Sequence, residues 1–308
     1  MRSCCEFIKR IYAIISVTAL CLISVLLITS PITASKASSL NEVAIPEALS
    51  DKQAKLLANW YQQLGLRQAD ESFGDLMARA ALLQKGKSYF NPPEFAGLET
   101  LRVNLDTFNC VSLIESSLAV ARCIWRNTAD EPCFIKELTK VRYRGGQLTG
   151  FASKLHYFDE WISDNAERGI LSDLSRQFGA AKKNHQANYV TTHKKRYPPL
   201  QDPTVFQQML DIEAKLRAKP AWVIDREKVA QAQQNLQTGD ILAVVGAKPS
   251  LLVRHAVMVY RDAKNKPHVL HASRYNHRVL LEHSDVATYI KRRSDRRGII
   301  VARPLAPK

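Results

Sequence analysis

A cysteine and two histidines stand in an order that could support nucleophilic catalysis. Cys110 follows a short polar stretch, 104–109, and begins an apolar segment whose hydrophobic residues recur at helical spacing. The first amides of a helix and its macrodipole stabilise negative charge. We therefore expect this position to lower the pKa of the thiol and to hold the oxyanion of a tetrahedral intermediate.

Two β-branched runs near the C-terminus supply candidate bases for that thiol. His255 lies in the run 253–260, and His271 lies in the run 269–274. Adjacent antiparallel strands would bring the two imidazoles together, so that one accepts the thiol proton and the other fixes its tautomer. Taken singly, a buried cysteine or a strand histidine is usually structural. The ordered combination favours a cysteine nucleophile with a histidine base.

The cysteines sort by position. Three belong to the N-terminal segment, and the others are Cys110, Cys123 and Cys133. Cys110 and Cys123 fall in one predicted helix at a separation of about 20 Å, too far for a disulfide. We expect a Cys123–Cys133 disulfide, which leaves Cys110 free. A zinc site built from Cys123, Cys133 and a histidine would lack the paired ligand spacing of structural zinc.

The N-terminus has the pattern of an export signal. A basic head that ends at Arg10 precedes the apolar stretch 11–29, and no charged residue occurs between Arg10 and Lys36. We assign residues 1–37 to a signal peptide and expect an exported, periplasmic protein. The alternative is an uncleaved membrane anchor, because about 20 apolar residues can span a bilayer. Membrane contact is expected only through this segment.

The charge balance is strongly basic. The formal net charge is +15; residues 1–37 hold four basic residues and one acidic residue, a net of +3, so the remainder carries +12. Such a surface attracts polyanions, which outside the cytoplasm include membrane headgroups and cell-wall glycopeptide. Clusters such as 194–196 and 291–293 belong to no recognisable nucleic-acid module, so nucleic acid is not an expected partner.

The order of expected elements is helices first and strands afterwards. Capping residues and helical periodicity predict helices near 51–64, 73–85, 110–125, 131–143 and 203–216. Short β-branched runs predict strands at 241–245, 253–260, 269–274, 278–281 and 299–303. This segregation predicts an α+β fold, with a helical N-terminal part packed on a C-terminal antiparallel sheet. We expect a single domain over 38–308 that includes an N-terminal helical subdomain at about 50–90.

Three stretches resemble a known family. The segment 104–115 around Cys110 resembles the nucleophile motif of the N-acetylmuramoyl-L-alanine amidase-like family, a branch of the NlpC-like papain-fold cell-wall hydrolases. Tyr143-Arg144-Gly145-Gly146 with 154–158 and Trp161-Ile162 is similar to its middle signature. Gly239-Asp240-Ile241, His255 and His271-Ala272-Ser273 are similar to its C-terminal signatures. Together these stretches span roughly residues 50–305.

The resemblance implies a papain-like hydrolase with Cys110 as nucleophile, His255 as base and His271 as orienting residue. It implies cleavage of the bond between N-acetylmuramic acid and L-alanine in peptidoglycan fragments (muropeptides), with no metal or organic cofactor. One alternative keeps this chemistry but cuts γ-D-glutamyl linkages in the stem peptide. A second is a non-catalytic basic protein that binds cell-wall polymers or membrane.

The resemblance also indicates a substrate-binding set. Its members are Asp106, Asn109, Tyr143, Arg144, Gly145, Gly146, His156, Tyr157 and Ser273. Arg144 could pair with a stem-peptide carboxylate, the glycines would let a ligand approach the backbone, and His156 and Tyr157 could line the cleft. Alternatively, this middle stretch packs a loop against the helical core. Asn109 departs from the family, which has an aspartate there, although asparagine still caps a helix.

Overall fold

Side-chain caps start most of the predicted helices. The computed structural model describes residues 48–93 and 97–308, so the predicted signal peptide lies outside the described residues. The side chains of Ser72, Asn109, Asp130 and Asp202 each accept a backbone N–H in the first turn of a helix, whereas Ser50 occupies the cap position without such a bond. The helices that follow are α1 (Asp51–Leu64), α2 (Phe73–Leu82), α3 (Cys110–Trp125), α4 (Glu131–Arg142) and α7 (Pro203–Ala218).

Further helices in the described residues have weaker sequence signals. They are α5 (Phe158–Glu167), α6 (Tyr189–Thr192), α8 (Val229–Ala232) and α9 (Val286–Lys291). Single 3-10 turns occur at Arg144–Gly146, Phe151–Ser153, Lys194–Arg196, Pro198–Gln201, Arg226–Lys228 and Gln233–Asn235. Within the described ranges, none of the helices is both long and apolar enough to cross a bilayer.

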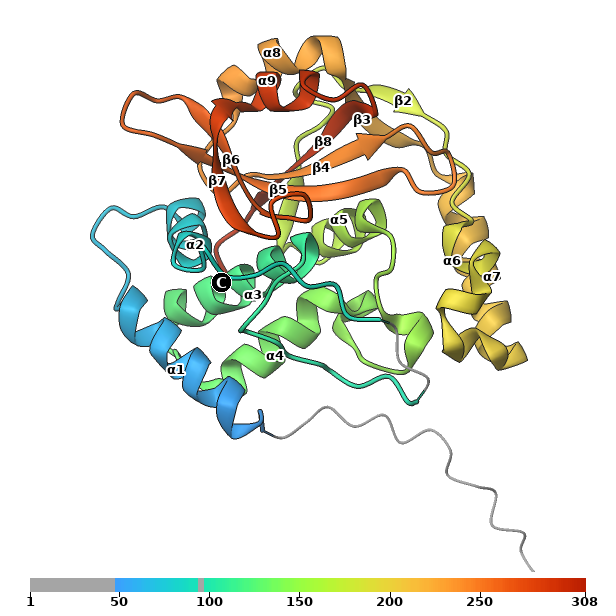
Figure 1. The fold of residues 1–308 in the computed structure, drawn as a ribbon, viewed down its shortest axis with the longest axis horizontal. Helices are drawn as coiled ribbons and strands as arrows, with labels where there is room; N and C mark the ends of the chain where they lie inside the picture. Colours follow the sequence, from blue (N-terminus) through green and yellow to red (C-terminus); the bar gives the residue numbers. More distant parts are fainter. Residues whose placement is uncertain (1–47, 94–96) are drawn as a thin grey trace, which may run out of the picture. The chain divides into compact units, whose positions relative to one another are not determined.

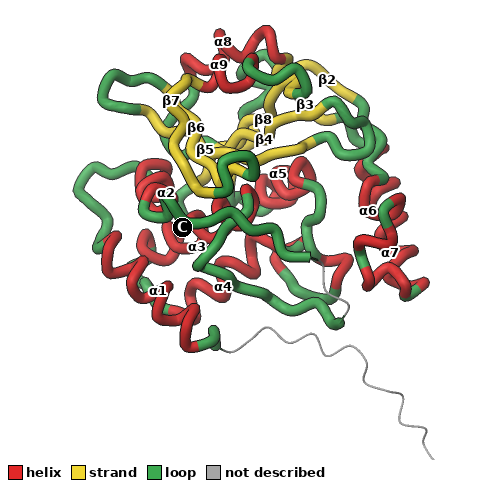
Figure 2. Tube along the Cα trace, viewed as in Figure 1, coloured by secondary structure: helices red, strands yellow, loops and turns green. Residues whose placement is uncertain are grey.

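The described strands form one antiparallel sheet of eight strands. They are β1 (Leu171–Asp173), β2 (Ala181–Lys183), β3 (Ala221–Asp225), β4 (Ile241–Gly246), β5 (Val253–Arg261), β6 (Pro267–Ser273), β7 (Arg278–Asp285) and β8 (Arg296–Pro304). The order is β2-β3-β8-β4-β5-β6-β7, and β1 pairs with β8. The five predicted strands are present, and the mixed helix and antiparallel-sheet architecture confirms the α+β class (Figures 1 and 2).

Helices cover both faces of this sheet. Figure 1 shows α2, α3 and α5 on one side and α8 and α9 on the other. Successive strand residues therefore alternate between two cores: Ile241 and Ala243 pack with the first group of helices, and Leu242 and Val244 pack with the second. This alternation explains why β4 is an apolar run without polar interruptions.

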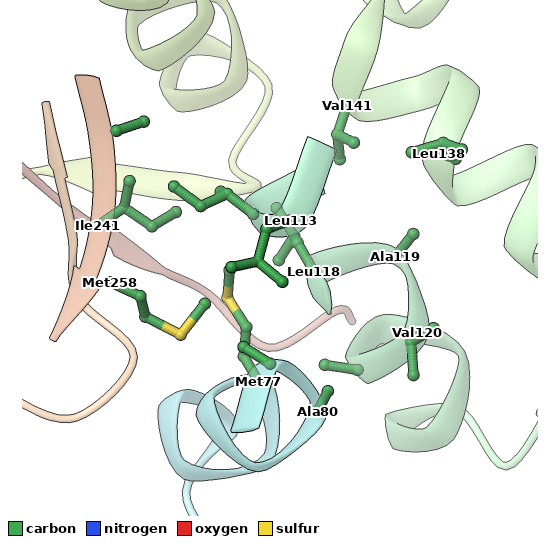
Figure 3. Packing of buried hydrophobic residues seen from close by; sticks show 14 of the residues in the cluster. Met77, Ala80, Leu113, Leu118, Ala119, Val120, Leu138, Val141, Ile241 and Met258 are labelled. Atoms are coloured by element: carbon green, nitrogen blue, oxygen red, sulfur yellow. The ribbon is translucent and has the colours of Figure 1, made fainter. Parts of the chain in front are cut away.

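The first core joins the N-terminal helices to the sheet. Met77 of α2 and Leu113 and Leu118 of α3 lie beside Met258 and Ile241 of the strands (Figure 3). All five side chains are almost fully buried. At about 1.5–3 kcal/mol for each large apolar side chain buried, such contacts hold α3 firmly against the sheet. The predicted helical subdomain at 50–90 therefore shares its core with the rest of the described chain.

A close backbone contact fixes α2 against the sheet. Gly74 lies against the turn that ends at Gly239, whose φ is +87°; a Cβ at Gly239 would lie 2.4 Å from the Gly74 backbone. Asp240 is buried and bound by Arg303 through contacts of 2.7 and 2.8 Å. The Gly239-Asp240-Ile241 signature thus has a structural role at the start of β4.

Candidate active site

The start of α3 is built around Cys110. The side-chain oxygen of Asn109 accepts the N–H groups of Val111 (3.0 Å) and Ser112 (2.8 Å). The Asn109 N–H in turn donates to Ser112 Oγ at 2.9 Å, which completes a capping box. Asparagine at this position therefore caps the helix fully, and the thiol is held at the first helical residue.

Cys110 is the free cysteine of the described chain, and its side chain is half-buried. Cys123 and Cys133 are joined in a disulfide, the pairing expected from the sequence, with Cα atoms 5.9 Å apart. This bridge ties the last part of α3 to the first turn of α4. The sulfur of Cys110, at the opposite end of α3, is not in a disulfide.

The electrostatics of Cys110 correct one expectation. Burial raises the pKa of the thiol, and hydrogen bonds from the backbone of Ala256, Cys110 and Val111 only partly oppose that effect. The helix start acts in the expected direction, but desolvation outweighs it. The thiol is therefore protonated at neutral pH, and forming a thiolate requires a base nearby.

The two histidines lie in direct contact. His255 of β5 and His271 of β6 place Nε2 and Nδ1 2.6 Å apart, with ring planes at 75°. Burial lowers the pKa of His255 well below its ordinary value, and the nearby His271 and Arg296 add to this. Burial also lowers the pKa of His271. These shifts favour the neutral form of both imidazoles, in which one ring nitrogen of each keeps its lone pair.

The start of α3 and the His255 segment of β5 lie close together. The backbone of Ala256, the residue after His255, lies close enough to the Cys110 sulfur to lower the pKa of the thiol. Although these residues are far apart in the sequence, the packing of α3 on β5 brings them to one place. A thiol, a neutral imidazole and backbone donors around the sulfur make up the parts of an acyl-transfer site.

A carboxylate that the sequence patterns did not single out completes this group. Glu282 of β7 places Oε1 3.2 Å from His271 Nε2 and Oε2 3.1 Å from Arg292 Nη2. The hydrogen bond from His271 is the largest influence that lowers the pKa of Glu282 to about 2. The available signal was an acidic residue directly after the apolar run Val279–Leu281 of β7, but nothing local linked it to His271.

A cavity of about 560 Å³ opens beside Cys110. Its lining includes Cys110 and Asn109, whereas His255 and His271 are not among the described residues that line it. Other lining residues, from segments distant in sequence, include Asn91, Glu99, Arg102, Glu115, Arg142, Tyr143, Lys154, His156 and Tyr197. The wall therefore carries both charges, so it suits a polar ligand with apolar parts.

Three members of the predicted substrate-binding set line this cavity. Asn109 lies next to the sulfur and donates to Asn91 Oδ1 at 3.1 Å. Tyr143 donates to Glu99 Oε1 at 3.0 Å, and His156 Nε2 lies 2.9 Å from the Phe151 carbonyl oxygen. Sequence reasoning did not identify Asn91, because only the fold brings it to Asn109.

The Arg144 turn is held by contacts within the protein. Arg144 contacts Glu160 Oε1 at 3.0 and 2.6 Å and also donates to the Ala152 carbonyl. The Gly145 N–H donates to Asp164 Oδ2 at 2.9 Å, and Gly145 and Gly146 have φ values of 62° and 77°. These residues lie outside the cavity lining. These contacts favour the alternative, in which the stretch packs a loop against the helical core.

Three further predicted binding residues lie elsewhere. Tyr157 is fully buried and donates to Glu213 Oε1 at 2.6 Å, because its ring belongs to the core around α7. Ser273 accepts two hydrogen bonds from Asn276 and stabilises the turn between β6 and β7. Asp106 forms an ion pair with Lys52 outside the cavity lining. Each side chain has a structural partner that its local sequence did not reveal.

In the part of the chain that the structure describes, no group of three or more histidine, cysteine, aspartate or glutamate side chains is arranged to hold a metal ion.

Comparison with known proteins identifies the family. Residues 90–299 match the model of the AmiA-like, N-acetylmuramoyl-L-alanine amidase-like family. The chain belongs to this family. Its fold is similar to that of an N-acetylmuramoyl-L-alanine amidase from Bacteroides uniformis, with 27% identity, a TM-score of 0.70, and coverage of 76% of this chain and 99% of that one. Membership supports a hydrolase acting on peptidoglycan.

Two other solved structures share this fold. A protein from Bacteroides fragilis, named as a xylanase candidate, is 28% identical with a TM-score of 0.66, over 72% of this chain and 98% of that one. A protein from Legionella pneumophila is 15% identical with a TM-score of 0.63, over 83% and 95%, which shows the fold alone. No curated protein sequence matches the chain.

Proposed function

We propose that this protein is a cysteine amidase of the NlpC-like, papain-fold type that hydrolyses the N-acetylmuramoyl-L-alanine bond of peptidoglycan fragments. The observation that carries the proposal is a free Cys110 at a helix start, packed against the His255 segment and opening into a polar cavity. Family membership supplies the substrate class.

The first half of the reaction forms a thioester. His255 accepts the Cys110 proton as the sulfur attacks the carbonyl of the muramoyl lactyl group. The oxyanion of the tetrahedral intermediate is stabilised by backbone N–H groups near the sulfur, including that of Cys110. His255 then donates its proton to the departing amine of L-alanine, and the C–N bond breaks.

The second half returns the enzyme to its starting state. Water attacks the thioester carbonyl while His255 accepts one of its protons. The C–S bond then breaks, and the proton passes to sulfur. His271 holds the imidazole of His255 in place throughout, through the 2.6 Å contact between their nitrogens.

The setting of this activity is also proposed. The basic head and apolar stretch before residue 37 support export to the periplasm, where muropeptides are present. The net positive charge favours encounter with stem peptides, which carry carboxylates. Peptidoglycan fragments are the proposed partners, and the N-terminal segment is the proposed point of membrane contact.

Product analysis tests the reaction directly. Full-length wild type and Cys110→Ala are incubated with a purified disaccharide-peptide, and products are identified by mass spectrometry. We expect free sugar and intact stem peptide from the wild type and loss of turnover in the variant, with its thermal unfolding unchanged. Dialysis against EDTA serves as a control, since a cysteine mechanism predicts retained activity.

Other products would redirect the proposal. Cleavage within the peptide would indicate the γ-D-glutamyl endopeptidase. Release of reducing sugar from xylan would support the activity named for the Bacteroides fragilis protein, which requires two carboxyl groups flanking the bond. Salt-dependent binding without turnover would indicate the non-catalytic alternative. Full turnover by Cys110→Ala would refute the cysteine mechanism.

A further inference from the structure

We propose that Glu282, fixed by Arg292, is a positioning residue that sets the tautomers of His271 and His255 so that Nδ1 of His255 is the proton acceptor. This inference rests on the proposed function, in which His255 is the base. It adds Glu282 and Arg292 to the group formed by Cys110, His255 and His271. Neither added residue belongs to the sequence signatures that resemble the family.

The strand register brings Glu282 to His271. Leu280 is the cross-strand partner of His271, and Glu282 follows two residues later on β7. Residues two apart on a strand share a face, so Glu282 lies diagonally across from the imidazole. The pairing between β6 and β7 shifts register just beyond Leu270 and Leu281. The side chain of Glu282 is only 10% exposed, so its contacts with His271 and Arg292 are sheltered from water.

The tautomers follow from counting donors along this chain of contacts. An ionised carboxylate only accepts, so Glu282 Oε1 requires a hydrogen on His271 Nε2. A neutral imidazole has one N–H, so His271 Nδ1 is an acceptor. It lies 2.6 Å from His255 Nε2, which must then be the donor. The remaining nitrogen of His255, Nδ1, then carries the lone pair that a base needs.

Charged groups of both signs face the histidine pair. Glu282 of β7 raises the pKa of both histidines, and Arg296 of β8 lowers both. Arg292, directly after α9, lowers the pKa of His271. Tyr289 of α9 lies edge-on to His271, and its own pKa is raised to about 12 by burial, so it stays neutral. Cys110 of α3 adds negative charge only as a thiolate.

Arg292 holds the Glu282 carboxylate in the orientation that leaves Oε1 facing His271. Its Nη2 lies 3.1 Å from Glu282 Oε2, so the two oxygens of Glu282 have different partners. When His255 accepts the thiol proton, the new positive charge is stabilised through His271 by the negative charge of Glu282. The proton stays on His255 Nδ1 until the leaving amine receives it, so no further reactant is needed.

Glu282→Gln is the variant that discriminates best, because an amide cannot satisfy both partners. If its oxygen faces His271, its NH₂ opposes the Arg292 donor. If its NH₂ faces His271, the hydrogens along the chain reverse, and His255 Nδ1 becomes protonated. We expect kcat to fall by about 10- to 100-fold with KM nearly unchanged. The acid limb of the kcat/KM profile should move to lower pH.

Glu160→Gln is the matched control. Glu160 is also paired with an arginine, Arg144, and its side chain is 12% exposed, close to the 10% of Glu282. It contacts neither histidine, so its variant should keep the wild-type kcat and pH profile. Any loss that comes merely from removing a sheltered carboxylate would appear in both variants.

Arg292→Gln tests the direction in which the acid limb of the pH profile moves. Arg292 is half exposed, so its replacement should leave the fold intact even if Glu282→Gln unfolds. Removing this positive charge should move the acid limb to higher pH, opposite to Glu282→Gln. The same variants are examined by alkylation of full-length protein with iodoacetamide at pH 7, followed by mass spectrometry of the Cys110 peptide. Alkylation should slow in Glu282→Gln and quicken in Arg292→Gln.

The two readouts separate this inference from the proposed function. If wild type does not hydrolyse muropeptides but alkylation shifts in opposite directions, the proposed function fails and the positioning role stands. If wild type hydrolyses them and neither variant differs from Glu160→Gln, the positioning role alone is overturned. Shifts in the same direction for Glu282→Gln and Arg292→Gln would also overturn it.

Discussion

Two arginine–glutamate contacts in this molecule look alike but have different neighbours. Arg144 binds Glu160, and Arg292 binds Glu282, with both glutamates similarly sheltered. The first contact ties a turn to α5 and touches neither histidine, although Arg144 lies within a recognisable signature. The second touches His271. Membership of a motif therefore indicated the family, while only the contacts show which pair reaches a histidine.

Replacing His255, the proposed base, should cause the largest loss of activity among these variants. In His255→Ala the Cys110 proton has no imidazole to accept it, and the pKa of that thiol is already raised by burial. We expect kcat/KM for muropeptide hydrolysis to fall roughly 10³-fold. Steady-state release of stem peptide measures this. A loss of less than tenfold in a folded variant would mean that another group is the base.

Arg144→Gln should lower the stability of the fold and leave catalysis almost unchanged. It removes hydrogen bonds to Glu160 and Ala152 and leaves a sheltered carboxylate without its partner. Because Arg144 is partly exposed, we expect a loss of about 1–2 kcal/mol in unfolding free energy. The values of kcat and KM should stay within about twofold of wild type. Denaturant unfolding and kinetics on one preparation check both; a large rise in KM would return Arg144 to the substrate site.

Stability should also depend on pH through the histidine pair, a smaller effect. The pKa values of His255 and His271 are lowered by folding, so below the ordinary imidazole pKa the unfolded chain binds more protons than the folded one. Stability from this source is full above about pH 6.5 and is lost as the pH falls. Denaturation midpoints at pH 7 and pH 5 should therefore differ less in His255→Ala than in wild type. Equal differences would contradict the assigned shifts.

Local chemistry made much of the fold predictable. Ser72, Asn109 and Asp130 carry explicit capping signals, and the helices begin where those signals place them. The helix α5 begins after Tyr157, whose side chain makes no capping bond, so no local signal marked its start. Strands such as β1, with three residues, are too short to show a period.

The site was predictable only in part, because several of its properties are not local. The histidine contact follows from two neighbouring strands, but the Glu282 contact also depends on the register between β6 and β7. Burial reversed the expected pKa shift of Cys110, and burial is set by packing from α3 and β5 together. Tyr197 reaches the cavity wall from a segment with no local sign of that role.

Trapping the acyl-enzyme tests the central claim most directly. Full-length protein is mixed with a disaccharide-peptide, quenched in acid within milliseconds and digested, and the Cys110 peptide is weighed by mass spectrometry. A thioester at Cys110 with the mass of the muramoyl sugar, removed by hydroxylamine, is the predicted result. Rapid turnover with an unmodified Cys110 at every time point, or a peptide acyl group on that sulfur, would contradict it.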